Sequence, residues 1–332
     1  MTAGHALVQA SSFSLPIANV RKVYDAERVE QKLAKLKDRD SEALRSTYER
    51  MIERGGHRFA VKPHGIPRMG ALYEELPNFG EVLDDVKRHV ALNQDSTEGM
   101  QLTPMLLLGP PGVGKTHFAR RLAEVLGTEL TIAPMSSMTA GWLLSGASSQ
   151  WKGARPGKVF EALVEGQYAN PVIVVDEIDK ASADAQYDPL GALYGLLEED
   201  TAREFTDEFA DLPIDASRVI WVTTANDERA IPEPILNRMN VFEIPAPTPE
   251  GARRIAANLY RSIRAEHDWG RHFVDAIDDD VLDLLSTLAP REMRRALMTA
   301  FGNARLDGRD ALTVGDLPKP SRRRAPIGFT AS

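Results

Sequence analysis

The middle of the chain alternates short apolar runs with stretches of helical periodicity. Runs of four or five mostly apolar residues occupy positions 105–108, 172–175 and 219–223, and helical stretches cover 117–126 and 190–197. Short apolar runs are typical of strands buried on both faces, and helices between them supply the crossovers of a parallel sheet. We therefore predict an α/β fold, with a parallel sheet flanked by helices, between residues 71 and 246.

A charged, amphipathic segment precedes this core. Val29, Leu33 and Leu36 recur at helical spacing, and the helical pattern ends at Gly55-Gly56. We predict a helical N-terminal extension over residues 1–70 and a further helix over residues 81–92. The charged face of the extension is either solvated or packed on a partner or neighbouring subunit, and the sequence leaves both readings open.

Prolines mark the end of the α/β pattern. Pro245, Pro247 and Pro249 form a hinge, after which the periodicity is helical only. The helices are expected over residues 250–267, 279–288 and 291–306. We predict a small all-helical subdomain over residues 247–317, followed by a basic, flexible tail over residues 318–332.

Composition narrows the classes of protein to consider. The 332 residues carry 40 Lys and Arg against 48 Asp and Glu, and the net charge of −8 disfavours a binder of duplex DNA. A chain without cysteine has no disulfides and no thiolate metal site. No apolar run is long enough to cross a bilayer, and residues 1–18 lack the pattern of a secretory signal. We expect a cytoplasmic protein with no membrane partner.

A glycine-rich segment follows the first predicted strand and leads into a helix. It reads Gly109-Pro110-Pro111-Gly112-Val113-Gly114-Lys115-Thr116, the phosphate-binding loop pattern in its strand–loop–helix context. The glycines let backbone N–H groups turn toward phosphates, and the helix N-terminus adds positive charge. Lys115 would bind the β- and γ-phosphates and Thr116 would ligate Mg²⁺, with His117 completing the nucleotide-contacting segment. ATP and Mg²⁺ are thus the predicted cofactors; the alternative is a Gly/Pro turn with a surface lysine.

Polar residues end the other two predicted strands. Asp176 and Glu177 follow the second strand, and two adjacent carboxylates at a buried strand end are costly unless a cation or water meets them. Asp176 would bind Mg²⁺, partly through water, and Glu177 would polarise the attacking water. Asn226 follows the third strand and would reach that water or the γ-phosphate. The alternatives are acidic residues that begin a helix and an asparagine that caps the next segment.

The order of these motifs resembles that of the AAA+ ATPases. That order is a phosphate loop, an acidic strand end, an asparagine after the next strand, an arginine and a helical lid. Within the superfamily, the sequence resembles the ATPase module of Lon-type proteases over roughly residues 75–317. The segments that carry the resemblance are 109–116, 151–158, 175–180, 188–193 and 234–239.

The resemblance implies subunits that form rings, commonly hexamers, and bind ATP between neighbours. By position, Arg238 would be the arginine finger that reaches the neighbour's γ-phosphate, and the alternative is an ordinary surface arginine. Arg291 follows Ala289-Pro290 and would be the second sensor at the start of a lid helix, although Arg294 and Arg295 lie nearby. Asn226 would take the role of the first sensor.

The resemblance also assigns a role to Trp151 and Lys152. In related unfoldases a loop at this place carries an aromatic–hydrophobic pair into the central pore, where it grips the substrate polypeptide. Lys152 departs from that pattern because the family usually has an aliphatic residue there, and the lysine would suit an acidic or specific substrate. The alternative is a tryptophan packed into the sheet.

The sequence as a whole indicates an ATPase that remodels or unfolds protein substrates as a ring, for which a separate peptidase or adaptor could be a partner. We expect no proteolysis by the chain itself, because no group of residues outside the nucleotide motifs has the layout of a hydrolytic triad. The alternatives are an ATPase acting on nucleic-acid complexes, such as a loader or transposition helper, and a nucleotide-gated scaffold with negligible turnover. The tripeptide Ile327-Gly328-Phe329 weakly resembles a peptidase-docking motif; otherwise it belongs to the tail.

Overall fold

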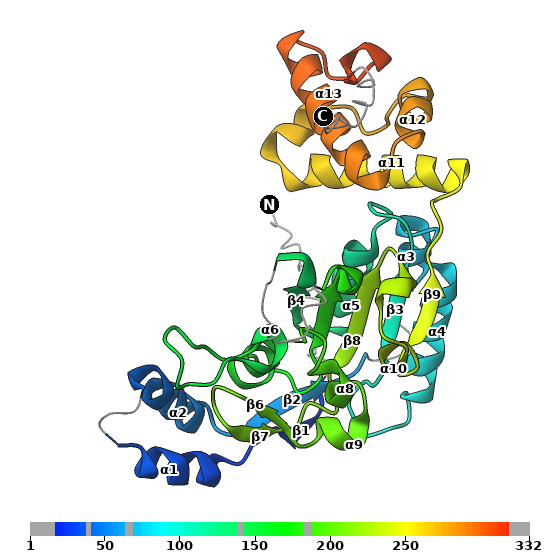
Figure 1. Cartoon of the computed structure of the whole chain (residues 1–332). Coiled ribbons are helices and arrows are strands. Elements are labelled where there is room, and N and C mark those ends of the chain that lie inside the picture. The colour runs from blue at the N-terminus through cyan, green and yellow to red at the C-terminus, as the bar shows by residue number, and fades with distance from the viewer. Residues whose placement is uncertain (1–16, 38–40, 64–68, 138–141, 182–187, 319–332) are drawn as a thin grey trace, which may run out of the picture.

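A five-stranded parallel sheet forms the centre of the protein in a computed structural model that describes residues 17–37, 41–63, 69–137, 142–181 and 188–318 (Figure 1). The strands follow the order β4-β5-β8-β3-β9. Their bounds are β3 Met105–Leu108, β4 Leu130–Pro134, β5 Val172–Asp176, β8 Ile220–Ala225 and β9 Asn240–Glu243. The three predicted strands are therefore confirmed as the three central ones, and two edge strands, β4 and β9, were not predicted from the sequence.

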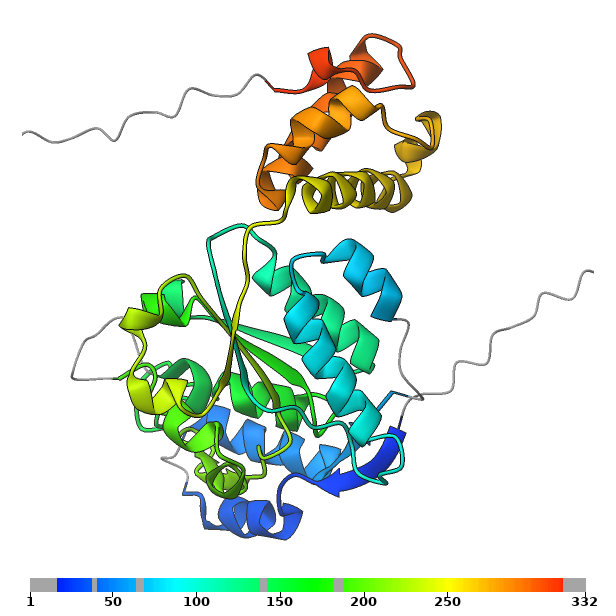
Figure 2. The same ribbon diagram turned by 90° about the vertical axis from the view of Figure 1, so that its right-hand side faces the viewer.

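The central strands are buried on both faces by different parts of the chain. On one face, helices α3 (Met69–Glu75), α4 (Gly80–Leu92) and α5 (Lys115–Leu126) pack on Met105 and Leu107, among others. On the other face, Leu106 and Trp221 lie in a cluster that extends into the N-terminal segment. Figure 2 shows the first group of helices lying side by side along the sheet. The central strands are continuous apolar runs in the sequence because both of their faces are covered by other parts of the chain.

The N-terminal extension is mixed rather than helical. It contains α1 (Ala26–Lys35) and α2 (Glu42–Arg54), but β1 (Ile17–Lys22) and β2 (His57–Val61) also pair as an antiparallel sheet, which corrects the expectation of helices alone. The apolar sides of the helices face this chain's own core, where Val29 and Met51 are fully buried. The Tyr48 hydroxyl donates to the Ala210 carbonyl at 2.7 Å. The extension therefore packs on the α/β core of its own chain, while the charged sides of the helices remain outside.

Three helices after β9 form a second body with its own core. They are α11 (Pro249–Glu266), α12 (Asp279–Ser286) and α13 (Pro290–Leu306), close to the predicted bounds. Figure 1 shows them above the sheet, joined to it by the chain that leaves β9. The Thr248 side chain caps α11 by accepting from Gly251 N–H at 3.1 Å, so the proline-rich hinge ends in a defined helix start. The predicted all-helical lid is confirmed.

Short elements connect the sheet to these larger parts. The predicted helix at 190–197 is shortened to one turn, α8. The short helices and the small hairpin are α6 (Trp142–Ser145), α7 (Lys158–Phe160), α8 (Leu193–Leu196), α9 (Glu199–Ala202), α10 (Glu233–Leu236), β6 (Phe205–Asp207) and β7 (Leu212–Ile214).

Asn170 joins the N-terminal extension to the sheet. Its amide donates to the carbonyls of Val61 (2.7 Å) and Met100 (3.0 Å), and its carbonyl accepts from Val61 N–H at 3.0 Å. The side chain is 1% exposed, so water cannot replace these partners. Because the asparagine directly precedes the Pro171–β5 segment, it ties β2 to the base of the central sheet.

We expect Asn170→Ala to lower the free energy of unfolding by about 2–4 kcal/mol, since it leaves buried backbone groups unpaired. Urea denaturation followed by circular dichroism measures this loss. Asn93→Ala is the control, because the Asn93 side-chain amide donates to the His89 carbonyl of the preceding helix, at a partly exposed position. A loss for Asn170→Ala no larger than that of the control would contradict this role.

Candidate functional site

The loop between β3 and α5 has the backbone shape that its glycines predict. Gly114 is the N-cap of α5 and has φ +107°, and Gly112 has φ +83°, a region that side chains other than glycine rarely adopt. Gly109 is needed for a different reason, since a Cβ there would lie 2.2 Å from the Ile244 carbonyl oxygen. The segment Gly109–Thr116 thus wraps the start of a helix of twelve residues, as an anion-binding loop requires.

Lys115 lies inside this loop and connects it to β8. Its ammonium group donates to the carbonyls of Gly109 (2.6 Å) and Pro110 (3.0 Å) and to the Asn226 side-chain oxygen (2.9 Å). Burial lowers the pKa of Lys115, while the nearby charges of Asp179, Asp176 and Glu177 oppose that shift. Lys115 and Asn226, predicted from separate motifs, are thus brought into direct contact.

Asp176 is the centre of a second set of contacts. Its Oδ1 accepts from the Thr116 hydroxyl at 2.9 Å and from the Thr224 hydroxyl at 2.8 Å. The Thr224 oxygen in turn accepts from Glu177 N–H at 2.9 Å. A hydroxyl and a carboxylate are hard oxygen ligands of the kind that Mg²⁺ prefers, so the donor set of Thr116 and Asp176 fits that ion.

Glu177 has a strained backbone. Its φ of +56° places it in the left-handed region, which is uncommon for a residue with a side chain. The bond from its N–H to Thr224 holds that conformation at the end of β5. Such strain concentrates at functional sites, and here it directs the chain away from the strand immediately after Asp176.

Two residues of this site, Thr224 and Asp179, were not assigned a role from the sequence. The Asp179 carboxylate accepts from Asn226 N–H at 3.2 Å and lies 3.7 Å from the Lys180 ammonium. Its Oδ1 is buried without a hydrogen-bond partner among the described residues. A parallel pairing of β5 with β8 would have indicated both residues, because polar residues at the carboxyl ends of adjacent parallel strands lie close together.

Arg238 lies apart from these contacts. Its Nε donates to Glu198 Oε1 at 2.6 Å and its guanidinium also bonds to the Pro234 carbonyl, with the side chain 27% exposed. Within the described part of the chain, no hydrogen bond or ion pair joins it to Lys115 or Asp176. The side chain is therefore partly exposed and is held by one glutamate and one backbone carbonyl.

Arg291 lies beside the phosphate loop, at the start of α13. A Cβ built on Gly112 would come within 3.7 Å of the Ala289 Cβ and 4.0 Å of the Arg291 Cβ. The arginine itself is exposed. The beginning of this lid helix and the tip of the loop are thus neighbours, although they are far apart in the sequence.

His117 is occupied by a partner that the sequence did not indicate. Its Nε2 lies 2.8 Å from Glu75 Oε1, and Arg121 Nε donates to the other oxygen of Glu75 at 3.0 Å. The His117 contact is the main cause that lowers the pKa of Glu75. The imidazole therefore joins α5 to α3, and its predicted contact with a nucleotide remains a prediction.

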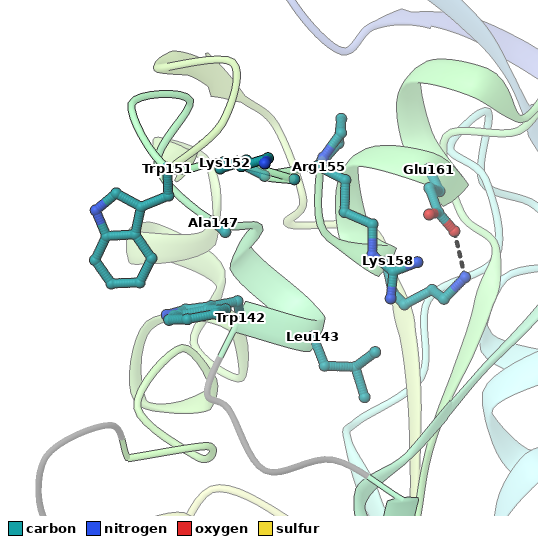
Figure 3. A pocket seen from close by; sticks show the side chains of 11 residues that line it. Trp142, Leu143, Ala147, Trp151, Lys152, Arg155, Lys158 and Glu161 are labelled. Atoms are coloured by element: carbon teal, nitrogen blue, oxygen red, sulfur yellow. Dashed lines mark hydrogen bonds and ion pairs between the residues drawn. The ribbon is translucent and has the colours of Figure 1, made fainter. Parts of the chain in front are cut away.

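Trp151 projects from a loop outside the sheet. Its side chain is 44% exposed and its ring meets that of Trp142 edge-on, with centroids 4.7 Å apart (Figure 3). The alternative of a tryptophan packed into the sheet is therefore wrong. Lys152 beside it is exposed as well.

The base of the Trp151 loop is fixed by Asp207 of β6. The Asp207 carboxylate accepts from Gly157 N–H at 2.8 Å and from the N–H groups of Phe209 and Ala210 at 3.0 Å. Burial raises the pKa of Asp207 to about 6. Ala147 N–H donates to the Arg155 carbonyl at 3.1 Å, so the loop is closed at its ends while its tip is open.

Comparison with known proteins identifies the fold around these residues. Residues 105–246 match the ATPase family associated with various cellular activities (AAA). The chain contains an AAA ATPase domain. Its sequence is 37% identical over 189 residues to Lon protease of Halothermothrix orenii, covering 56% of this chain and 24% of that protein. It is 33% identical over 241 residues to a mitochondrial Lon protease homolog of Aspergillus fumigatus, covering 71% and 21%. The chain thus spans about a quarter or less of the length of these relatives.

The fold of the AAA ATPase domain and lid also occurs among solved structures. A mutant of RuvB from Thermotoga maritima matches with a TM-score of 0.50 and 16% identity, over 71% of this chain and 66% of that one. At this identity the likeness concerns the fold alone.

Other predictions concern features outside this site. No helix in the described residues is long and apolar enough to span a membrane. Among the same residues, no group of three or more His, Asp or Glu side chains could hold a metal ion. The basic tail from 319 onward, with Ile327-Gly328-Phe329, lies outside the described residues.

We expect Thr224→Val to weaken binding of Mg²⁺-ATP by about 10–100-fold, because Asp176 loses one of the two hydroxyls that orient it. Thr224→Ser should retain near-normal affinity. The measurement is titration with a fluorescent ATP analogue with and without Mg²⁺.

Thr223→Val is the matched control for this variant. Thr223 is the preceding residue on β8, equally buried, but its hydroxyl donates to the Met105 carbonyl on the other face of the strand. If both valine variants weakened binding equally, general destabilisation rather than the Asp176 contact would account for the effect.

Proposed function

We propose that this chain binds and hydrolyses Mg²⁺-ATP and uses the cycle to remodel protein substrates as a ring oligomer. The observation that supports hydrolysis is that Lys115 contacts Asn226 while the adjacent Thr116 contacts Asp176, at the carboxyl ends of three adjacent strands. A phosphate-binding cation, a Mg²⁺ ligand pair and a polar sensor are what phosphoryl transfer to water requires in one place.

Each residue has a distinct part in the proposed reaction. Lys115 and the loop N–H groups would bind the phosphates, and Thr116 with Asp176 would hold Mg²⁺, which supplies charge stabilisation when bound. Glu177 would accept a proton from the attacking water, and Asn226 would orient that water. Arg291, beside the loop tip, would contact the phosphates from the lid of the same subunit.

Arg238 is proposed to act on a neighbouring subunit. Its partial exposure and its single carboxylate partner support this, because a guanidinium at the surface can exchange Glu198 for a phosphate that a second protomer presents. A ring contact of this kind is heterologous, with different surfaces of the two subunits meeting. We infer a hexamer because this is the common oligomeric state of the family.

A protein is the proposed substrate. The Lon relatives are proteases by name, the exposed Trp151 offers a ring for peptide contact, and the net charge of −8 disfavours nucleic acid. A separate peptidase or adaptor would be a partner of such a motor. The rival functions are a nucleic-acid ATPase, which would bind an oligonucleotide in place of a peptide, and a scaffold with negligible turnover.

We expect Glu177→Gln to reduce phosphate release by about 10²–10⁴-fold while ATP still binds, because only the proton acceptor is lost. Steady-state phosphate release and nucleotide titration measure the two effects. Glu228→Gln, the same change at an exposed position, is the control. Equal, near-zero turnover of wild type and Glu177→Gln would favour the scaffold.

We expect Arg238→Ala and Lys115→Ala each to abolish turnover, since loss of an arginine finger costs about 10³–10⁵-fold in rate. Mixed in equal amounts, the two variants should recover about a quarter of wild-type turnover, because one in four heterologous contacts joins an intact loop to an intact finger. Mixed complexes are verified by co-purification of differently tagged chains. Co-purification without recovery would show that Arg238 does not act across the contact.

A further inference from the structure

A small recess lies between the Trp151 loop and the helices α6 and α7. Its volume is about 130 Å³, which admits a single side chain. Figure 3 shows Trp142 and Trp151 at one end, with Leu143 next to Trp142 on α6 and Ala147 in the turn that follows that helix. Leu143 and Ala147 are buried, so the floor of the recess is apolar and already packed.

Cations dominate the rim of this recess. Lys152, Arg155 and Lys158 line it, against one acid, Glu161. Lys158 is paired with Glu161, as the dashed line in Figure 3 marks. Lys152 and Arg155 are exposed, and neither has a carboxylate partner among the residues that the structure describes. Two uncompensated positive charges therefore stand at the recess of a chain whose net charge is −8.

The recess is built on a fixed loop. Trp151 N–H donates to the Ser148 carbonyl at 2.9 Å and Ala154 N–H to the Trp151 carbonyl at 3.1 Å. The Asp207 carboxylate holds Gly157 N–H below them. A site that is ordered before binding loses less conformational entropy when a ligand arrives, so weak charge contacts can contribute to affinity.

We propose that this recess binds acidic segments of polypeptide, with a carboxylate side chain between Lys152 and Arg155 and a neighbouring apolar side chain against the tryptophans. The proposal rests on the proposed function in protein remodelling and names its class of substrate. The chemistry is a charge-assisted hydrogen bond to a carboxylate beside an aromatic surface.

The geometry favours a peptide over single-stranded nucleic acid. Binding of bases needs open aromatic faces on which successive bases stack. Here the two tryptophan rings meet at 79°, so the edge of one ring covers the face of the other. A recess for one side chain suits a carboxylate or an apolar side chain better than a stacked base.

The test uses the full chain and short fluorescein-labelled peptides in which Leu alternates with Glu or with Gln. Fluorescence anisotropy should show that the Glu peptide binds at least about ten-fold more tightly than the Gln peptide, with the difference shrinking at high salt. The double variant Lys152→Glu, Arg155→Glu should weaken binding of the Glu peptide by about ten-fold or more, since two attractions become repulsions.

The matched control is Lys87→Glu with Arg305→Glu, which makes the same change in net charge at two exposed positions elsewhere. Circular dichroism verifies folding of both double variants. Equal binding of the Glu and Gln peptides, or an equal effect of the two double variants, would overturn the proposal. So would tighter binding of an oligo-dT strand that the Lys152→Glu, Arg155→Glu change abolishes.

Peptide binding is measured in the Glu177→Gln protein, without hydrolysis. Failure of turnover in the wild type therefore counts against the proposed function, whereas failure of peptide selectivity counts against this substrate class alone.

Discussion

The shared acceptor Asp176 Oδ1 is the contact on which the site depends. Thr116 reaches it from the start of α5 and Thr224 from the end of β8, at 2.9 and 2.8 Å. The start of α5, the end of β8 and the end of β5, which are distant in sequence, are thus joined at the Asp176 Oδ1 atom. Because a partly buried carboxylate oxygen is costly unless hydrogen-bonded, this arrangement favours a single register of β5 against β8 and a single position of the loop.

Lys115 links the phosphate loop, which follows β3, to the end of β8. Its ammonium joins two loop carbonyls to the Asn226 side chain, while Asn226 N–H bonds to Asp179 beyond β5. Partial burial of the ammonium lowers the pKa of Lys115. Three nearby carboxylates oppose that shift and so favour the charged form of the lysine at this end of the sheet. A ligand with phosphate oxygens would compete with these same carbonyl and amide oxygens for the ammonium. Binding of such a ligand would therefore change the hydrogen bond between Lys115 and Asn226, and through Asn226 it would reach Asp179.

The sequence predicted those parts of the fold whose signals are local. The loop Gly109–Thr116 is a contiguous pattern, and the central strands are continuous apolar runs because both of their faces are covered. The edge strands gave no such signal: three of the four residues of β9 are exposed, and β4 is only partly buried. The pairing of β1 with β2 joins Ile17 to Val61 across two helices, which no local pattern encodes.

The lid and the loop are mechanically joined through two adjacent glutamates of α3. Glu74 accepts from the Asn258 side chain of α11 at 2.9 Å through its carbonyl and lies 3.5 Å from Arg254, while Glu75 binds His117 and Arg121 of α5. A rotation of α11 that carries α3 with it would therefore act on α5, the helix that begins at Lys115. The start of α13 also lies beside Gly112, so the C-terminal helices contact the phosphate loop directly there and contact α5 indirectly through α3. Both contacts lie on the side of the sheet that carries α3 and α5, so they connect the C-terminal helices to the loop without passing through the sheet.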